Sequence, residues 1–412
     1  MAFSKLDIKS YNLDELTELI VDLGLKKYRA GQVFEWIYKN HALSFEEMTN
    51  ISKSERGLLA TRFHLSRPKR IQTETSEDGT QKLLFELEDG HTIESVLIPD
   101  DDLSAQAGRL TLCISSQVGC AQACRFCLTG KGGFTRNLAA HEIVDQVLGA
   151  EGYLAGAGRN DEGRGTKDNG GGTREEGRET KDEGRRTRGE GRETRDEGRG
   201  GAMHASPLQK HITNIVLMGM GEPLANFDEV VKALGIITSN KGLGFSPRRV
   251  TLSTAGLVPE IERLGKSGIR VNLAVSLNAT TDAVRDLIMP VNRRYPIKEL
   301  LTACRRHPLE PRKRITFEYV LLKGVNDSEE DALRAAKMLK GIRGKVNLIP
   351  FNPFPGSEYD GPDEKTIRRF QRILLDHRYI APVRESRGRD ISAACGQLRE
   401  RGSHTIETRD EG

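Results

Sequence analysis

Apolar residues follow two different periods in the first part of the chain. Helical spacing over Leu13–Leu23 and Tyr28–Tyr38 predicts two helices. Two later runs, Gln81–Leu87 and Thr92–Ile98, flank an Asp-Gly turn and predict a β-hairpin. We therefore expect residues 1–90 to form a small accessory domain of helices and a β-hairpin.

Short runs rich in β-branched residues alternate with helical patterns over the rest of the chain. Six of them are predicted to be buried strands: Leu110–Ile114, Ile212–Met218, Arg249–Ser253, Val271–Ser276, Ile315–Leu321 and Lys345–Ile349. Alternating strands and helices form parallel sheets, and six such units are too few for a closed barrel of eight. The predicted fold class is α/β, a partial (βα)6 TIM-like barrel over residues 91–400, with its chemistry at the carboxyl ends of the strands.

Residues 158–201 interrupt this pattern with a segment that has no apolar side chain. The segment uses only Gly, Arg, Lys, Asp, Glu, Asn and Thr, and threonines recur every seven residues from Thr166 to Thr194. A coiled coil needs an apolar seam, so we interpret the repeat as tandem duplication of a short unit. Residues 158–201 and the similar tail at 401–412 are predicted to be disordered, because neither can build a core.

The composition of the whole chain indicates where in the cell the protein is expected. Hydrophobic residues make up 36% of the 412 residues, and the net charge is +4. No apolar run approaches the roughly 18 residues of a membrane span, and the first twenty residues lack the apolar stretch of a signal peptide. We expect a cytoplasmic protein without membrane contact, in which six cysteines favour metal-binding or catalytic thiols over disulfides.

Three of the cysteines, Cys120, Cys124 and Cys127, form a C-x3-C-x2-C motif after the first predicted strand. Three thiolates can hold three irons of a [4Fe-4S] cluster and leave the fourth iron open. A structural zinc site normally has four ligands in paired knuckles, and no suitable fourth ligand lies close in the sequence. The motif therefore favours the cluster, and its spacing resembles that of the radical S-adenosylmethionine (SAM) superfamily, in which the open iron binds SAM.

Polar and glycine residues follow the predicted strands. The carboxyl ends of parallel strands converge on one rim, so we expect these residues to bind SAM together. A glutamate there can accept a hydrogen bond from the cofactor's amino group, and glycine lets the backbone approach a ligand closely. The predicted cofactor-binding residues are Gly221, Glu222, Ser253, Ser276, Leu277, Asn278 and Asn352.

Five segments together resemble the RlmN-type ribosomal and transfer RNA adenine-C2 methyltransferases. They are the cysteine motif, Met218–Pro223, Arg249–Gly256, Asn347–Pro355 and Asp390–Leu398, and the likeness covers nearly the whole chain outside the low-complexity segments. This chain has Ser276-Leu277-Asn278 where the family usually has Ser-Leu-His. The resemblance implies methylation of adenine C2 in the peptidyl-transferase region of 23S rRNA, and of the adenine 3′ of the anticodon in tRNA, with two SAM molecules used per turnover.

The resemblance also implies three catalytic residues. Cys395 would accept a methyl group from one SAM, and the radical made from a second SAM would abstract hydrogen from that methyl, so that the carbon radical adds to adenine C2. Glu94 would take the C2 proton. Cys113 would attack the sulfur of Cys395, which releases the methylated base and leaves a disulfide between them. Cys304 is interpreted as a small buried hydrophobic residue.

Three alternatives stay open from the sequence. They are methylation of adenine C8 by the same chemistry, a radical enzyme for a small molecule or protein with a structural Cys395, and a non-catalytic iron-sulfur RNA-binding protein. The basic stretch His64–Arg70 is compatible with a solvated linker or with a phosphate-contacting patch, and the second reading makes residues 1–90 an RNA-binding domain. The expected partners are 23S rRNA, tRNA and an electron donor such as flavodoxin or ferredoxin, and we expect a monomer.

Overall fold

The computed structural model describes residues 5–100, 108–160 and 211–399, without the side chains of residues 157–160. Most of the segment predicted to be disordered, and the whole predicted tail, lie outside the described residues. The backbone of residues 158–160 belongs to helix α5 (Ala140–Asn160). In the described part of the chain, no helix is long and apolar enough to cross a membrane.

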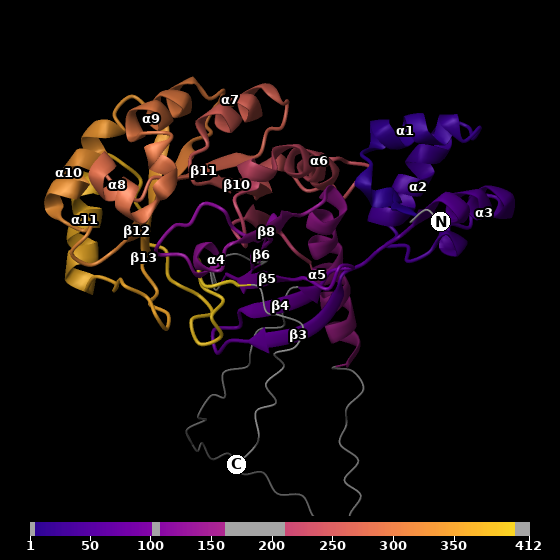
Figure 1. Cartoon of the computed structure of the whole chain (residues 1–412), viewed down its shortest axis with the longest axis horizontal. Helices are drawn as coiled ribbons and strands as arrows, with labels where there is room; N and C mark the ends of the chain where they lie inside the picture. Colours follow the sequence, from indigo (N-terminus) through magenta and orange to yellow (C-terminus); the bar gives the residue numbers. More distant parts are fainter. Residues whose placement is uncertain (1–4, 101–107, 161–210, 400–412) are drawn as a thin grey trace, which may run out of the picture.

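A nine-stranded sheet forms the centre of the molecule, in the order β13-β12-β11-β10-β9-β6-β5-β4-β3 (Figure 1). The strands from β6 to β13 in this order are parallel and match the six predicted strands, which confirms the α/β fold. Their bounds are β6 (Leu110–Cys113), β9 (Asn214–Leu217), β10 (Val250–Thr254), β11 (Asn272–Ser276), β12 (Ile315–Leu321) and β13 (Gly344–Pro350).

Three antiparallel strands extend the sheet beyond β6. The predicted hairpin is present as β4 (Gln81–Glu86) and β5 (Thr92–Pro99), and β3 (Lys69–Thr75) forms the edge. β5 pairs with β6, which places Val96 opposite Cys113. The central sheet therefore continues across residue 90, and the predicted domain division at that residue stays a prediction.

Helices lie outside the parallel strands and alternate with them along the chain (Figure 1). They are α6 (Phe227–Thr238), α7 (Val258–Lys266), α8 (Asp282–Ile288), α9 (Ile297–Arg306), α10 (Glu329–Met338) and α11 (Glu364–Asp376). α11 buries Ile367, Phe370 and Leu374 at helical spacing, as an amphipathic helix on a sheet does. α5 packs closely on β4, since a Cβ on Gly149 would come within 2.9 Å of the ring of Phe85.

The N-terminal residues form a separate lobe beside the sheet (Figure 1). Its helices α1 (Leu13–Asp22) and α2 (Tyr28–Tyr38) confirm the two predicted helices, and α1 begins with a capping box between Asn12 and Glu15. A third helix, α3 (Lys53–Arg62), was not predicted from the sequence, although Ser52 and Glu55 form the same capping signal. The short elements are β1 (Leu6–Asp7), η1 (Ile8–Ser10), η2 (Phe45–Glu47) and β2 (Phe63–His64).

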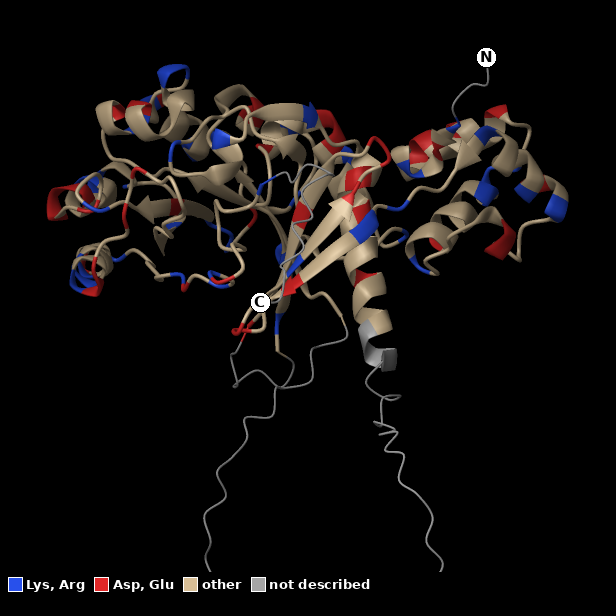
Figure 2. Cartoon of the chain, turned by 60° about the horizontal axis from the view of Figure 1, so that its bottom comes forward, with Lys and Arg blue, Asp and Glu red and all other residues tan. Residues whose placement is uncertain are grey.

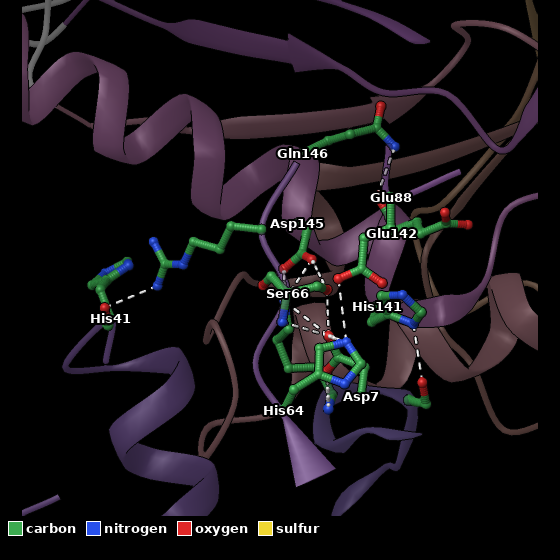
Figure 3. A network of polar contacts seen from close by, with 12 residues as sticks. Asp7, His41, His64, Ser66, Glu88, His141, Glu142, Asp145 and Gln146 are labelled. Atoms are coloured by element: carbon green, nitrogen blue, oxygen red, sulfur yellow. Dashed lines mark hydrogen bonds and ion pairs between the residues drawn. The ribbon is translucent and has the colours of Figure 1, made fainter. Parts of the chain in front are cut away.

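Buried polar groups join this lobe to α5 (Figure 3). The Lys9 Nζ atom lies 2.7 and 2.5 Å from the two carboxylate oxygens of Asp145, and it also donates to the carbonyl of Ser66. The Ser66 amide donates to Asp7 at 2.7 Å. Lys9 and Asp145 are both fully buried, so each offsets the loss of hydration of the other. The lobe is thus fixed to the sheet domain by a specific ion pair.

The basic stretch His64–Arg70 is divided between the lobe and the sheet. Ser66 is buried in the network above, and Arg67 donates to the carbonyl of His41 at 2.9 Å. Lys69 and Arg70 are exposed at the edge strand β3. Of these basic residues, Lys69 and Arg70 are the exposed ones, so the predicted contact with phosphate would depend on them. Basic and acidic residues are interspersed over the rest of the view in Figure 2.

Replacing Glu151 with Gln is expected to stabilise the protein above neutral pH. Glu151 lies on α5 beside His41 of the lobe, with 3.8 Å between Oε2 and Nε2, and burial raises the pKa of its carboxyl to about 7. A carboxyl with a raised pKa binds its proton more tightly when folded, so ionisation costs stability progressively from about pH 4.5 to 7. The variant avoids this cost.

The advantage of Glu151→Gln should grow by about 1–2 kcal/mol between pH 5 and pH 8, after allowance for partial exposure. Urea unfolding at the two pH values measures it, with the exposed Glu18→Gln on α1 as the control. An advantage that is the same at both pH values would contradict the assignment.

Candidate active site

The cysteine motif lies between two short paired strands, β7 (Gln117–Gly119) and β8 (Phe134–Asn137). The Cys120 amide donates to the carbonyl of Gly133 at 2.6 Å, which fixes the start of the loop. Gly119 has φ +73°, and a Cβ there would collide with that same carbonyl, so this position requires glycine. Cys127 directly precedes the one-turn helix α4 (Leu128–Lys131), which ends the loop.

The geometry of this loop fits an iron-sulfur cluster. The thiols of Cys120, Cys124 and Cys127 line one cavity. Burial and the two neighbouring thiols raise the pKa of Cys124 well above its ordinary value, and positively charged iron would offset both effects. No three His, Cys, Asp or Glu side chains in the described ranges converge on a single ion position. A cluster requires no such convergence, because each thiolate binds a different iron.

The same cavity extends over the carboxyl ends of the parallel strands. It is open to solvent and encloses about 950 Å³, including the space at its mouth. The predicted cofactor residues on its wall are Gly221, Glu222, Ser253, Ser276, Asn278 and Asn352. The structure does not bring Leu277 to this wall: its side chain is buried in the main core. The roles of all these residues in binding SAM remain predictions.

Glu222 is buried beside the cluster loop and already holds two backbone amides. Its Oε1 atom accepts from the amide of Leu224 at 3.0 Å, and Oε2 accepts from Ala255 at 2.6 Å. Burial raises its pKa to about 7. Gly221 has φ +99°, and a Cβ there would come within 2.6 Å of Gln117. Glycine is therefore required here by close packing against β7, a different reason from the approach of a ligand that the sequence suggested.

Asn352 offers an unused acceptor to a polar ligand. Its side chain is buried, and its Oδ1 atom has no hydrogen-bond partner among the described residues. A buried polar atom without a partner is costly unless a ligand or water satisfies it. Asn352 lines the cavity of the cluster cysteines, so a hydrogen bond from a nucleoside in that cavity would remove the cost.

Cys395 connects this cavity to a second one. The second cavity is lined by Cys113, Cys395, Arg384 and Ser386, and it also includes Cys127. Cys395 is exposed, whereas Cys113 is buried at the end of β6. Burial and the nearby Cys395 thiol raise the pKa of Cys113 to about 12. The structure therefore brings together the thiols of Cys113 and Cys395, which lie 282 positions apart in the sequence. Cys395 also lines the cavity of the cluster cysteines.

Glu94 lies on β5 of the predicted hairpin, and its side chain is buried. Its carboxylate is 1% exposed, with Oε1 3.4 Å from the Lys82 Nζ atom and Oε2 accepting from the Arg399 amide at 3.0 Å. Glu94 does not line either cavity. Glu94 lies two residues before Val96 on β5, so both side chains are on the same face of the sheet. Val96 pairs with Cys113, and Glu94 therefore shares a face with that cysteine. Its predicted role as a base stays a prediction.

Two family models match this chain. The ribosomal RNA large subunit methyltransferase N-terminal domain matches residues 6–65, and the radical SAM superfamily matches residues 194–336. The dual-specificity RNA methyltransferase RlmN of Syntrophotalea carbinolica is 48% identical over 396 residues, which are 96% of this chain and 90% of that protein. The protein of the same name from Geobacter sulfurreducens is 47% identical, over 96% of this chain and 92% of its own length.

The chain belongs to the RlmN family of radical SAM methyltransferases.

A solved structure extends the likeness to three dimensions. A radical SAM methyltransferase from Sphaerobacter thermophilus superimposes with a TM-score of 0.77 at 40% identity, and the match covers 96% of this chain and 99% of that chain. Membership of the family implies a [4Fe-4S] cluster and SAM as cofactors, which the cysteine loop and the cavity can accommodate. The N-terminal lobe corresponds to the matched N-terminal domain of the family.

Asn278 stands where the RlmN family usually has a histidine, and it is held by hydrogen bonds within the protein. Its Oδ1 atom accepts from the Val320 amide at 2.8 Å, and its carbonyl accepts from Asn326 at 2.6 Å. It has φ +54°, a left-handed conformation that asparagine tolerates better than most residues. Through these contacts Asn278 joins the end of β11 to the end of β12.

Three charged residues at this site were not predicted from the sequence. Glu318 and Arg384 line the cavity of the cluster cysteines. The nearby Cys395 thiol raises the pKa of Arg384, and the charge of Glu318 raises it further. A glutamate inside the buried run Ile315–Leu321 was a signal that could have identified Glu318. Arg285 lies behind the cavity on α8, completely buried, and nothing in its local sequence marks it.

Proposed function

We propose that this chain methylates C2 of an adenine in 23S rRNA and of the adenine 3′ of the anticodon in tRNA, through a methyl group carried on Cys395. One observation carries the proposal: Cys395 lines both the cavity of the cluster cysteines and the cavity that contains Cys113. A sulfur that collects a methyl group in one place and delivers it in another needs this position. When bound, the cluster and SAM supply the methyl group and a carbon-centred radical.

The chain's own residues have distinct tasks in this scheme. Cys395 holds the transferred carbon, Cys113 takes up the sulfur of Cys395 as a disulfide when the base leaves, and Glu94 accepts the proton from C2. Ser386 presents a buried oxygen with no partner among the described residues to the cavity that contains Cys113. This oxygen supports adenine as the occupant, because adenine carries an amino donor.

RNA is supported as the substrate class by the N-terminal lobe. That lobe matches a ribosomal RNA methyltransferase domain, and the relatives are named RNA methyltransferases. A structured RNA would have to unstack the target adenine before it could reach Cys395. We further propose a monomer that works in the cytoplasm and takes electrons from a flavodoxin or ferredoxin.

Mass spectrometry of Cys395 tests the scheme. Anaerobically reconstituted protein is incubated with methyl-labelled SAM, the Cys395 peptide is weighed, and 23S rRNA or tRNA is then added. We expect a labelled methyl on Cys395 that passes to adenine C2. Label at C8 would select the alternative position, and unmodified Cys395 with an intact cluster would indicate a radical enzyme of another kind.

A further inference from the structure

A buried lysine on the antiparallel extension contacts the chain that carries Cys395. Lys82 of β4 has a side chain that is 1% exposed, and its Nζ atom donates to the carbonyl of Ile391 at 2.5 Å. The same atom lies 3.4 Å from Glu94 and 3.3 Å from Glu74. An ammonium group is rarely buried unless it is paired, so this set of partners is specific.

The partner of Lys82 contacts the same segment on the other side of Cys395. The Oε2 atom of Glu94 accepts from the amide of Arg399 at 3.0 Å. Ile391 and Arg399 each lie four residues from Cys395, one before it and one after it. A single buried ion pair therefore holds both ends of a nine-residue loop, and Cys395 is at its centre.

Two further contacts set the direction of this loop. The amide of Leu128 donates to the carbonyl of Gly396 at 2.6 Å, and Thr129 Oγ1 donates to the carbonyl of Leu398 at 2.5 Å. Both donors belong to α4, directly after the cluster cysteine Cys127. The loop thus lies between α4 and the face of the sheet that carries Lys82 and Glu94.

We propose that Lys82 and Glu94 act together as positioning residues that hold the loop 391–399 closed, so that Cys395 stays at the junction of the two cavities. Releasing either end would let the loop move away from α4. This inference deepens the proposed function, because it concerns the residue that carries the methyl group there. It also gives Glu94 a task besides that of a base: in the closed loop one of its oxygens is bound to Arg399.

Lys82→Met tests the proposal, since methionine has a similar length and no charge. Hydrogen exchange of reconstituted enzyme, followed on peptides that contain Ala393 and Arg399, should become at least about tenfold faster, and Cys395 methylation without RNA should slow by a similar factor. Lys82→Arg should restore protection in part, because it keeps the charge and can still donate. Lys69→Met is the matched control: Lys69 is an exposed lysine of β3 that pairs with Glu86 at 3.4 Å.

Iron content and the melting temperature show whether each variant is folded and loaded. Unchanged exchange of residues 391–399 in Lys82→Met, or an equal increase in Lys69→Met, would overturn the proposal. If Lys82→Met does not fold, Lys82→Arg decides. Faster exchange of residues 391–399 than in the unsubstituted enzyme, with complete iron loading, would support the clamp, and unchanged exchange would oppose it. Unmethylated Cys395 in the unsubstituted enzyme would defeat the proposed function, whereas Lys82-dependent protection of the loop would still support the clamp.

Discussion

Cys395→Ala is expected to lower RNA methylation by at least about a thousandfold, because the alanine cannot carry the methyl group on sulfur. The variant keeps the cluster loop unchanged, since Cys120, Cys124 and Cys127 are separate residues on the β7–β8 loop. Its iron content should therefore equal that of the unsubstituted enzyme. Transfer of labelled methyl to 23S rRNA and tRNA measures the loss.

Cys304→Ala provides the control for Cys395→Ala. Cys304 is also a free cysteine, but it is buried within α9, and burial raises its pKa to about 12. This position confirms its interpretation as a small buried hydrophobic residue. Cys304→Ala should keep methylation within a few fold of the original rate, at a modest cost in core packing. Equal losses in the two variants would mean that Cys395 contributes only to stability.

Arg285→Met is expected to destabilise the protein by about 3–5 kcal/mol and to weaken SAM binding. The guanidinium group donates to the carbonyls of Leu277 at 3.0 Å, Ala255 at 2.7 Å and Ser276 at 3.0 Å. It also donates to Asn292 Oδ1 at 3.1 Å. Methionine would leave these acceptors without their charged donor at the ends of β10 and β11. Urea unfolding gives the loss of stability, and equilibrium dialysis of reconstituted protein gives the change in SAM affinity.

The matched control for Arg285→Met is Arg372→Met on α11. Arg372 is 77% exposed and pairs with Asp376 at 3.2 Å, an arrangement that contributes less than about 1 kcal/mol. Arg285→Lys should recover only part of the stability, because an ammonium group cannot reproduce the planar fork of a guanidinium. If Arg285→Met lost no more stability than Arg372→Met, the four hydrogen bonds would have no net value.

The sequence by itself determined the local elements and the cluster motif. The predicted helices α1 and α2, the β-hairpin and the six parallel strands all depend on periodicity over a few residues, which is a local property of the chain. Cys120, Cys124 and Cys127 were found in the same way, because cluster ligands on one loop lie close in sequence. The roles of Cys395, Cys113 and Glu94 came only from the resemblance to a family.

Only the tertiary structure decided which distant residues meet. Lys82 and Ile391 lie 309 positions apart, and a buried lysine in a strand carries no local sign of its partner. Arg285 binds three carbonyls at the ends of two strands, and backbone acceptors leave no trace in the side-chain pattern. The sheet extension through β5 likewise placed Cys113 beside the loop of Cys395. Periodicity encodes which face of an element is buried, whereas these contacts depend on how complete elements pack against one another.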